Sequence, residues 1–363
     1  MNNRFKKKVV VLMSGGLDSS VAAALLKKQG YEIVGAFINF GYSLINNNEK
    51  KIENICCSSE AEKRARQVAK ILKIPFYLIN LEKEFKKKVI DQFFFYLKKG
   101  WTPNPCVFCN EEIKFRFALE FFLKKGFDFV ASGHYAKKEE KRENGKIFFS
   151  LKEGKDKKKD QSYFLYRLKT WQLKKIIFPL ADLTRKEVEA MARKFKLEPV
   201  LKIRKSVDIC FVNNDLFSFL RENLGERKGK ILDKKGNLLG YHRGFWFYTL
   251  GQRQGLNLPQ GPYFVFQKDF QRNLLFVTKN KRDLFFKKIF LERLNFFEKL
   301  KLPRVVFVKI RYSQKKGRAR LFFKNKRYFL TFEKGVFAAT PGQSAVFYFK
   351  DKVLGGGIIS AVC

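Results

Sequence analysis

The first third of the chain alternates short apolar runs with segments whose apolar positions follow a helical period. Residues 9–12 form a run rich in β-branched side chains, which is typical of a strand buried on both faces. Further apolar runs follow at 31–40, 76–79 and 127–131. The periodic segments that predict helices lie over 59–72, capped by Ser58 or Ser59, and over 85–99 and 111–124. This alternation predicts an α/β fold with a doubly wound parallel sheet that binds ligands at the carboxyl ends of its strands.

The first apolar run ends in the glycine-containing turn S-G-G-L-D-S, which leads into a helix. Adjacent glycines let the backbone turn sharply and approach a ligand, and the N–H groups at a helix start favour an anion. The turn lacks the lysine of the G-x-x-x-x-G-K-[ST] loop, and it is not G-x-G-x-x-G. It resembles instead the pyrophosphate loop of enzymes that split ATP into AMP and pyrophosphate. The alternative is a serine-rich turn that caps an ordinary helix.

The rest of the chain changes from charged segments to short strands. Residues 137–159 hold an apolar island between lysine-rich stretches, which predicts a hairpin or a mobile loop. Thr184 and Glu187 have the spacing of a capping box for a helix over 183–197. A small β-barrel is predicted by strands over 305–312, 319–323, 327–332, 344–349 and 353–359. We therefore expect three domains: an ATP domain over 1–212, a mainly β central domain over 213–285 and a C-terminal β-barrel over 286–363.

The charge of the chain points to a polyanionic partner. Lys and Arg total 76 against 34 Asp and Glu, which gives a net charge of +42. Such an excess is typical of proteins that bind nucleic acid through its phosphates. The alternative is a bias in genome composition, because Lys and the 42 Phe residues both have A/T-rich codons.

Six cysteines and two histidines are few for 363 residues. The cysteines show no disulfide-framework spacing, and the N-terminus has no secretory pattern. No apolar run reaches the roughly 18 residues that span a bilayer. We expect a cytoplasmic protein with reduced thiols and no membrane association.

Two cysteine motifs carry candidate chemistry. In T-P-N-P-C-V-F-C-N the prolines fix an extended loop, and a helix follows, so Cys109 is expected at a helix N-terminus where the dipole stabilises a thiolate. The alternatives for the Cys-x-x-Cys pair are a metal or cluster site and structural burial. Cys210 lies within D-I-C-F-V, where a small buried apolar role is the default.

Together these segments resemble one family, the bacterial tRNA-specific 2-thiouridylases. The resemblance runs from Met13 to Ile359. It is carried by M-S-G-G-L-D-S-S, T-P-N-P-C-V-F-C-N-x-x-I-K-F, A-S-G-H-Y-A, K-D-Q-S-Y-F-L, D-I-C-F-V, Y-T-L-G-Q-R-x-G-L and T-P-G-Q-S-A-V-F-Y, in that order. It implies that the first domain is adenine nucleotide alpha hydrolase-like.

The resemblance also implies site residues. Cys109 matches the catalytic nucleophile and Cys210 the cysteine that carries the persulfide. The matches to ATP-binding positions are Met13, Ser14, Gly15, Gly16, Leu17, Asp18, Ser19, Ile38 and Gly133. The matches to target-base and tRNA contacts are Asn104, Pro105, Cys106, His134, Lys159, Asp160, Gln161, Arg311, Tyr312 and Gln343.

The sequence departs from the family pattern at several positions. Ile38 replaces a frequent Met near the adenine, and Asn39-Phe40-Gly41 stands where Lys-Asn-Trp is usual. Lys205 replaces an Asp that often precedes Ser206. Cys106 adds a third thiol, which leaves open an iron–sulfur cluster held by Cys106, Cys109 and Cys210.

The implied reaction replaces the C2 oxygen of the wobble uridine with sulfur. ATP would adenylate that oxygen, with Asp18 placing Mg²⁺, and Cys210 and Cys109 would then deliver sulfur and form a disulfide. The two cysteines must meet, so we expect a mobile loop around Cys210. The implied partners are tRNA and a persulfide carrier or cysteine desulfurase, and we expect a monomer. The alternatives are an amide-forming ligase of the same ATP-splitting class and a non-catalytic RNA-binding protein.

Overall fold

The computed structural model describes residues 6–41, 58–143, 145–201, 209–212 and 216–363. The chain divides into two compact units. The first contains residues 1–89, 106–213 and 351–353, and the second contains residues 90–105, 214–350 and 354–363. The chain therefore passes from the second unit back into the first between Pro105 and Cys106. Within the described ranges, no helix has the length and apolar character needed to cross a membrane.

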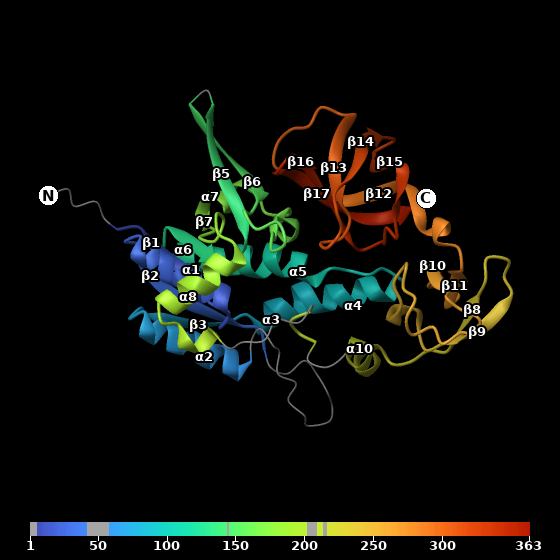
Figure 1. Ribbon diagram of the computed structural model, residues 1–363, viewed down its shortest axis with the longest axis horizontal. Helices are drawn as coiled ribbons and strands as arrows, with labels where there is room; N and C mark the ends of the chain where they lie inside the picture. The colour runs from blue at the N-terminus through green and yellow to red at the C-terminus, as the bar shows by residue number, and fades with distance from the viewer. Residues whose placement is uncertain (1–5, 42–57, 144, 202–208, 213–215) are drawn as a thin grey trace. The chain divides into compact units, whose positions relative to one another are not determined.

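The first unit is built on a five-stranded parallel sheet, which confirms the predicted doubly wound fold (Figure 1). Its strand order is β3-β2-β1-β4-β7. The bounds are β1 Lys8–Leu12, β2 Glu32–Asn39, β3 Phe76–Asn80, β4 Phe129–Ser132 and β7 Ile176–Ile177. The order reverses between β1 and β4, and ligands of such sheets bind at that switch point, beyond the carboxyl ends of the strands. The two-residue β7 has no counterpart among the predicted strands.

Helices follow the strands as the sequence predicts, and π-helix replaces α-helix in two segments. They are α1 Leu17–Lys28, α2 Ser59–Ile71, α3 Glu82–Phe85, α4 Asp91–Lys98, α5 Pro105–Phe108, α6 Ala118–Lys124, α7 Thr170–Lys175, α8 Arg185–Lys194, α9 Glu198–Leu201 and α10 Leu216–Leu224. Ser58 caps α2, and Thr184 and Glu187 form the predicted capping box of α8. The wider π-helix occurs over Lys86–Ile90 (η1) and Cys109–Phe117 (η2), within segments predicted simply as helical. Short 3-10 turns lie at Ser162–Leu165 (η3), Phe245–Phe247 (η4) and Lys281–Leu284 (η5).

The predicted hairpin within 137–159 is present as β5 Ala136–Glu143 and β6 Lys146–Glu153, which pair antiparallel (Figure 1). β5 begins four residues after β4 ends. The segment 132–135, at the carboxyl end of β4, therefore connects the sheet directly to this hairpin.

The second unit contains a small sheet and a closed barrel. The small sheet has the order β10-β11-β8-β9. Its bounds are β8 Gly229–Leu232, β9 Leu238–His242, β10 Phe264–Asp269 and β11 Leu274–Thr278. Ile231, Phe245, Val265 and Leu275 form its core.

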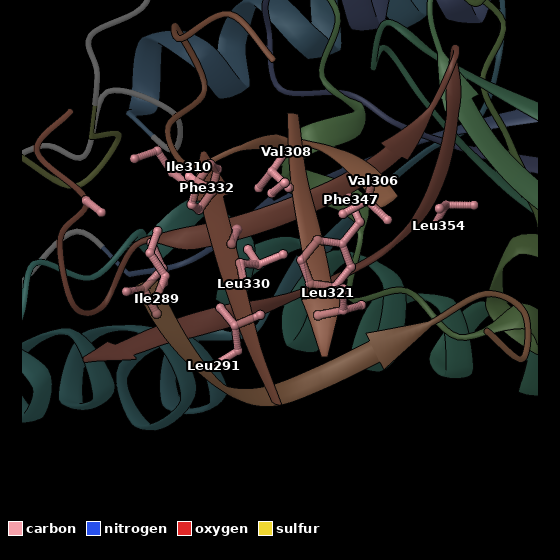
Figure 2. Packing of buried hydrophobic residues seen from close by; sticks show 14 residues of the cluster. Ile289, Leu291, Val306, Val308, Ile310, Leu321, Leu330, Phe332, Phe347 and Leu354 are labelled. Atoms are coloured by element: carbon pink, nitrogen blue, oxygen red, sulfur yellow. The ribbon is translucent and has the colours of Figure 1, made fainter. Parts of the chain in front are cut away.

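The barrel has the order β12-β15-β14-β13-β16-β17 and is closed by pairing of β12 with β17. Its strands are β12 Phe285–Phe296, β13 Arg304–Lys309, β14 Gly317–Lys324, β15 Arg327–Phe337, β16 Ser344–Phe349 and β17 Lys352–Val362. Aliphatic side chains, Phe332 and Phe347 fill its interior (Figure 2). The prediction of five strands was wrong by one, because it omitted β12. Register shifts interrupt β12 near Phe286 and again after Phe290, so its apolar positions do not alternate cleanly.

Candidate active site

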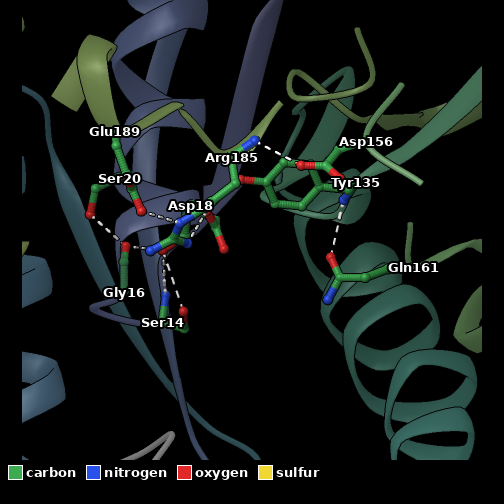
Figure 3. Close-up of polar contacts among 10 residues, drawn as sticks. Ser14, Gly16, Asp18, Ser20, Tyr135, Asp156, Gln161, Arg185 and Glu189 are labelled. Atoms are coloured by element: carbon green, nitrogen blue, oxygen red, sulfur yellow. Dashed lines mark hydrogen bonds and ion pairs between the residues drawn. The ribbon is translucent and has the colours of Figure 1, made fainter. Parts of the chain in front are cut away.

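The loop between β1 and α1 is folded by its own serine side chains. Ser19 Oγ accepts a hydrogen bond from Ser14 N at 3.2 Å and donates to Gly16 O at 3.1 Å. Ser20 Oγ donates to the same carbonyl at 2.9 Å (Figure 3). Gly16 is the N-cap of α1 and has no side chain with which to cap it. The N–H groups of the first turn are therefore suited to bind an anionic ligand.

Three positions at this edge are occupied by glycine, each for a different structural reason. Gly15 has φ +70°, and a Cβ there would lie 2.1 Å from Ala61 O on α2. A Cβ on Gly133 would lie 2.6 Å from Ser19 N, so the end of β4 packs directly on the start of α1. A Cβ on Gly16 would meet nothing closer than Ser14 Oγ at 3.5 Å. Packing explains Gly15 and Gly133, whereas Gly16 leaves open space above the loop. Met13 and Leu17 are buried beside the loop, and Ile38 is buried at the end of β2.

The carboxylate of Asp18 is held by two residues that sequence reasoning gave no role. Tyr135 OH donates to Asp18 Oδ1 at 2.8 Å, and Arg185 Nη1 donates to the same oxygen at 2.9 Å (Figure 3). Arg185 also bonds Glu189 at 2.8 Å. Burial and the Asp18 carboxylate raise the pKa of Tyr135, so this phenol remains protonated and is a donor. Tyr135 lies in the A-S-G-H-Y-A motif and Arg185 opens the helix that Thr184 caps, but neither signal pairs these residues with Asp18.

His134 follows Gly133 and lies against aromatic rings. Its Nδ1 is 2.9 Å from Ser132 Oγ, and its ring is 5.7 Å from that of Phe115. Burial, and then the charge of Lys114, lowers the pKa of His134 well below its usual value. The imidazole is therefore neutral at neutral pH and can either donate or accept a hydrogen bond.

The K-D-Q segment is folded onto the same strand end. Asp160 is 2% exposed and accepts from Gly154 N at 3.1 Å and from Ser162 Oγ at 2.9 Å. Burial raises the pKa of Asp160. Gln161 Oε1 accepts from Tyr135 N at 3.0 Å, and Gln161 N donates to Tyr135 O at 2.8 Å. Gln161 thus fixes Tyr135, which follows His134, and Asp160 fixes its own segment to the end of β6. Lys159, the preceding residue, is half-buried.

Cys109 is not at a helix N-terminus, and that prediction was wrong. Helical residues begin at Pro105, where the fixed φ of proline suits the first turn, and Phe108 is itself helical. Cys106 therefore occupies the first turn and is half-buried, whereas Cys109 begins the π-helix η2 and is 6% exposed. π-helical segments are frequent at functional sites. Arg167 anchors η2 through two hydrogen bonds to the carboxylate of Glu111.

Cys210 is half-buried, and its neighbour Phe211 ties it to the core of the first unit. The Phe211 ring lies 6.0 Å from that of Phe85, on α3, and α3 also contacts η2. Both cysteine segments thus adjoin α3. Cys106, Cys109 and Cys210 carry thiols, not disulfides. Among the described residues, no three Cys, His, Asp or Glu side chains gather as a metal site. Residues 202–208, which include Lys205, Ser206 and most of the expected mobile loop, lie outside the described ranges, as do Cys56 and Cys57.

The remaining predicted tRNA contacts lie in the second unit. Asn104 ends the loop that follows α4, and Pro105 begins α5. Arg311 and Tyr312 follow β13 and are half-buried, and Gln343 lies in the turn before β16. Arg311 Nη2 and Gln343 Nε2 both donate to atoms of the protein itself.

Comparisons with known proteins agree over nearly the whole chain. Family models match residues 7–214 (tRNA methyl transferase HUP domain), 217–279 (tRNA methyl transferase PRC-barrel domain) and 286–359 (aminomethyltransferase beta-barrel domain). A tRNA-specific 2-thiouridylase of Karelsulcia muelleri is 40% identical, over 98% of this chain and 99% of that protein. The enzyme of the same name from Caldicellulosiruptor saccharolyticus is 41% identical, over 98% of each.

A solved 4-thiouridine synthetase in complex with RNA and ATP aligns to 58% of this chain and 46% of its own, at 18% identity and a TM-score of 0.34. Similarity this low does not bear on function. The full-length relatives do establish the family, and the three family models agree with the α/β sheet, the small domain and the barrel described above. This chain belongs to the family of tRNA-specific 2-thiouridylases.

Proposed function

We propose that this chain catalyses the ATP-dependent 2-thiolation of the wobble uridine of tRNA. The observation that carries the proposal is the identity of about 40% over full length with curated 2-thiouridylases. Two features of the first unit support it. The anion-binding loop stands at the switch point of the sheet, and Cys109 and Cys210 belong to the same compact unit.

The first step would activate the uridine. The C2 carbonyl of uracil is a poor electrophile, and its oxygen is a poor leaving group. Attack of that oxygen on the α-phosphorus of ATP forms an adenylated base and releases pyrophosphate. The Ser14–Ser19 turn would hold the pyrophosphate with the first-turn N–H groups of α1, and the open space above Gly16 lets phosphate approach the backbone.

Magnesium is a proposed cofactor of this step. Mg²⁺ usually takes one or two carboxylates together with substrate phosphates. The Asp18 carboxylate fits that role, because it is a hard oxygen donor at the edge of the loop. When bound, the ion would neutralise charge on the phosphates. Tyr135 and Arg185 both bond Asp18 Oδ1 and so orient this carboxylate.

The second step would transfer sulfur. The terminal sulfur of a persulfide on Cys210 attacks C2 and displaces AMP, leaving Cys210 joined to C2 through two sulfurs. The Cys109 thiolate then attacks the Cys210 sulfur, which releases the 2-thiouridine and forms a Cys109–Cys210 disulfide. A thiol reductant supplies the two electrons that reopen it. Alternatively, Cys109 attacks first and frees hydrosulfide, which then attacks C2. Both routes end in the same disulfide.

We further propose how RNA and sulfur reach the site. Asn104, Pro105 and Cys106 would contact the target base, which must leave the anticodon stack at a cost of a few kcal/mol. The net charge of +42 would supply phosphate contacts that repay this cost. A persulfide carrier or cysteine desulfurase would load Cys210. We also propose a cytoplasmic monomer with domains over 1–212, 213–285 and 286–363.

Mass spectrometry of nucleosides tests the function directly. The protein is incubated with unmodified tRNA, Mg²⁺, ATP and a persulfide donor, and the tRNA is then digested. We expect 2-thiouridine that appears only when ATP is present. ATP–pyrophosphate exchange driven by small acids and indifferent to tRNA would instead favour an amide-forming ligase. Binding of tRNA without any ATP turnover would instead favour a non-catalytic RNA-binding protein.

A further inference from the structure

Tyr135 is bonded at both ends, and each end meets a different part of the proposed site. Its OH donates to Asp18 Oδ1 at 2.8 Å, on the loop that would hold the phosphates of ATP. Its main-chain N donates to Gln161 Oε1 at 3.0 Å, and its main-chain O accepts from Gln161 N at 2.8 Å (Figure 3). One residue thus connects the ATP loop with the segment 154–161, which contains three of the proposed tRNA contacts.

Close packing leaves Tyr135 little room to move on its own, since it is only 1% exposed. A Cβ on Gly154 would lie 3.0 Å from Tyr135 C, so the 154–161 segment packs directly on the tyrosine backbone. Two residues before the tyrosine, Gly133 packs against Ser19 N in the same way. Closely packed interiors transmit small shifts. A displacement of the 154–161 segment must therefore move Tyr135, and with it the phenol oxygen.

A second connection runs through Arg185 and reaches the same carboxylate. Arg185 Nη1 donates to Asp18 Oδ1 at 2.9 Å, and Arg185 N donates to Asp156 Oδ2 at 2.9 Å (Figure 3). The other carboxylate oxygen of Asp156 accepts from Lys158 N at 3.0 Å and from Lys159 N at 3.3 Å. These lysines and the ATP loop are therefore linked through hydrogen bonds that do not involve the tyrosine.

The two substrates would act on opposite ends of these bonds. Gln161 Oε1 is occupied by Tyr135 N, so Nε2, which points away from the tyrosine, is the atom that would donate to RNA (Figure 3). ATP with Mg²⁺ would bind at Asp18. Both ligands would order the same set of hydrogen bonds, so the second to bind loses less conformational entropy. Such coupling is reciprocal: each ligand raises the affinity of the other by the same factor.

We propose that Tyr135 is a positioning residue that couples the two substrates. It holds Asp18 for ATP and Gln161 for tRNA at once, so that each substrate strengthens the binding of the other. The bonds through Arg185 and Asp156 act in parallel with it. This inference rests on the proposed function, which supplies both ligands.

Binding measurements test the coupling without turnover. The Kd of the full chain for unmodified tRNA is measured by filter binding at one salt concentration, with Mg²⁺ alone and with Mg²⁺ and saturating α,β-methylene ATP, which cannot be split between those phosphates. The coupling ratio is the first Kd divided by the second. We expect a ratio of about fivefold or more for the wild type. Tyr135→Phe removes only the phenol oxygen and should show at most half of the wild-type ratio.

Tyr248→Phe is the matched control for this substitution. Tyr248 is also buried, and its OH donates to Gly255 O at 3.2 Å in the second unit. The control should keep the wild-type ratio. A tyrosine that only supports the fold would weaken each ligand alone and leave the ratio unchanged. An unchanged ratio in Tyr135→Phe therefore overturns the proposal, as does a wild-type ratio of one.

A second pair of variants tests the parallel connection. Asp156→Asn removes the oxygen that accepts from Arg185 N. Its control is Asp233→Asn, because Asp233 also accepts main-chain N–H bonds in a lysine-rich turn. The double variant Tyr135→Phe/Asp156→Asn should bind tRNA equally with and without the ATP analogue, whereas the control should couple like the wild type. Wild-type coupling in the double variant would show that these bonds do not cause it.

Nucleoside analysis of the same proteins separates the coupling from the reaction itself. If 2-thiouridine forms but the wild-type ratio is one, only the coupling fails. If the ratio holds but no 2-thiouridine forms, only the proposed reaction fails. Titration of the ATP analogue with and without tRNA must give the same ratio as titration of tRNA, because coupling is reciprocal, and unequal ratios would overturn the proposal.

Discussion

Alanine substitutions at the adjacent glycines Gly15 and Gly16 should separate the structural glycine of the loop from the ligand-facing one. Gly15→Ala places a side chain in left-handed backbone at φ +70°, which costs about 1–2 kcal/mol. Its Cβ also meets Ala61 O at 2.1 Å, so the loop and α2 must move apart, and such overpacking costs about 1–3 kcal/mol more. The total is about 2–5 kcal/mol. At roughly 2–4 °C for each kcal/mol, Tm should fall by about 4–20 °C.

Gly16→Ala should change stability much less than Gly15→Ala. Gly16 has φ −98° and ψ 165°, which alanine adopts without strain, and its Cβ would meet nothing closer than 3.5 Å. Loss of glycine freedom in the unfolded chain favours the variant by about 0.4–1 kcal/mol. Alanine is a poorer N-cap of α1 than glycine, which opposes this gain, so stability should stay nearly unchanged. The added methyl group nevertheless stands above the loop, where phosphate oxygens approach, so ATP should bind more weakly.

Thermal unfolding followed by circular dichroism, and ATP titration by calorimetry, check both effects on the full chain. The expected pattern is a low Tm for Gly15→Ala and a normal Tm with at least tenfold weaker ATP binding for Gly16→Ala. The reasoning is refuted if Gly16→Ala binds ATP like the wild type, or if Gly15→Ala melts like it.

Three further predictions follow from charges and buried contacts. Burial lowers the pKa of His242 to about 4 from the usual 6.5, and Gly244 N donates to its Nδ1 at 3.0 Å. The unfolded chain therefore takes up this proton before the folded one, and as pH falls from 6.5 to 4 the histidine should remove up to about 3 kcal/mol of stability. Urea unfolding at several pH values should show a shallower loss for His242→Gln, and parallel curves would contradict this. Glu111→Gln leaves the Arg167 guanidinium, whose side chain is 9% exposed, without its carboxylate, and should cost about 3–5 kcal/mol in urea unfolding. A cost below about 1 kcal/mol would show that the pair does not anchor η2. Finally, tRNA affinity should fall by about a thousandfold or more between 50 and 200 mM salt if six or more phosphates are contacted, and a flat salt response in a filter-binding assay would contradict phosphate-driven binding.

Local sequence signals predicted a helix or strand correctly where its formation depends on residues close together in the sequence. The buried run over 9–12 and the capping box at Thr184 act within a few residues, and both are present in the structure. β12 and β7 were missed for physical reasons. Register shifts break the alternation in β12, and the two residues of β7 are too few to show a period. The Glu111–Arg167 pair that anchors the π-helix at Cys109 joins residues 56 positions apart, so helix propensity does not predict it.

The candidate site was predictable as a set of motifs but not as a set of contacts. Thr102, Thr249 and Gln343 each stand in a motif that the sequence shows. The bonds among them join residues 147 and 241 positions apart, however, and no local rule states which motifs meet. The Asp18–Arg185 pair spans 167 positions in the same way.

The central claim is that ATP is split to activate a uridine that sulfur from Cys210 then attacks. The most direct measurement counts AMP and 2-thiouridine formed per tRNA in one turnover, for the wild type and for Cys210→Ser loaded with the same persulfide donor. The account predicts one AMP for each 2-thiouridine in the wild type. It predicts no 2-thiouridine in Cys210→Ser, although that variant still binds ATP. Normal thiolation by Cys210→Ser, or thiolation without AMP, would contradict the account.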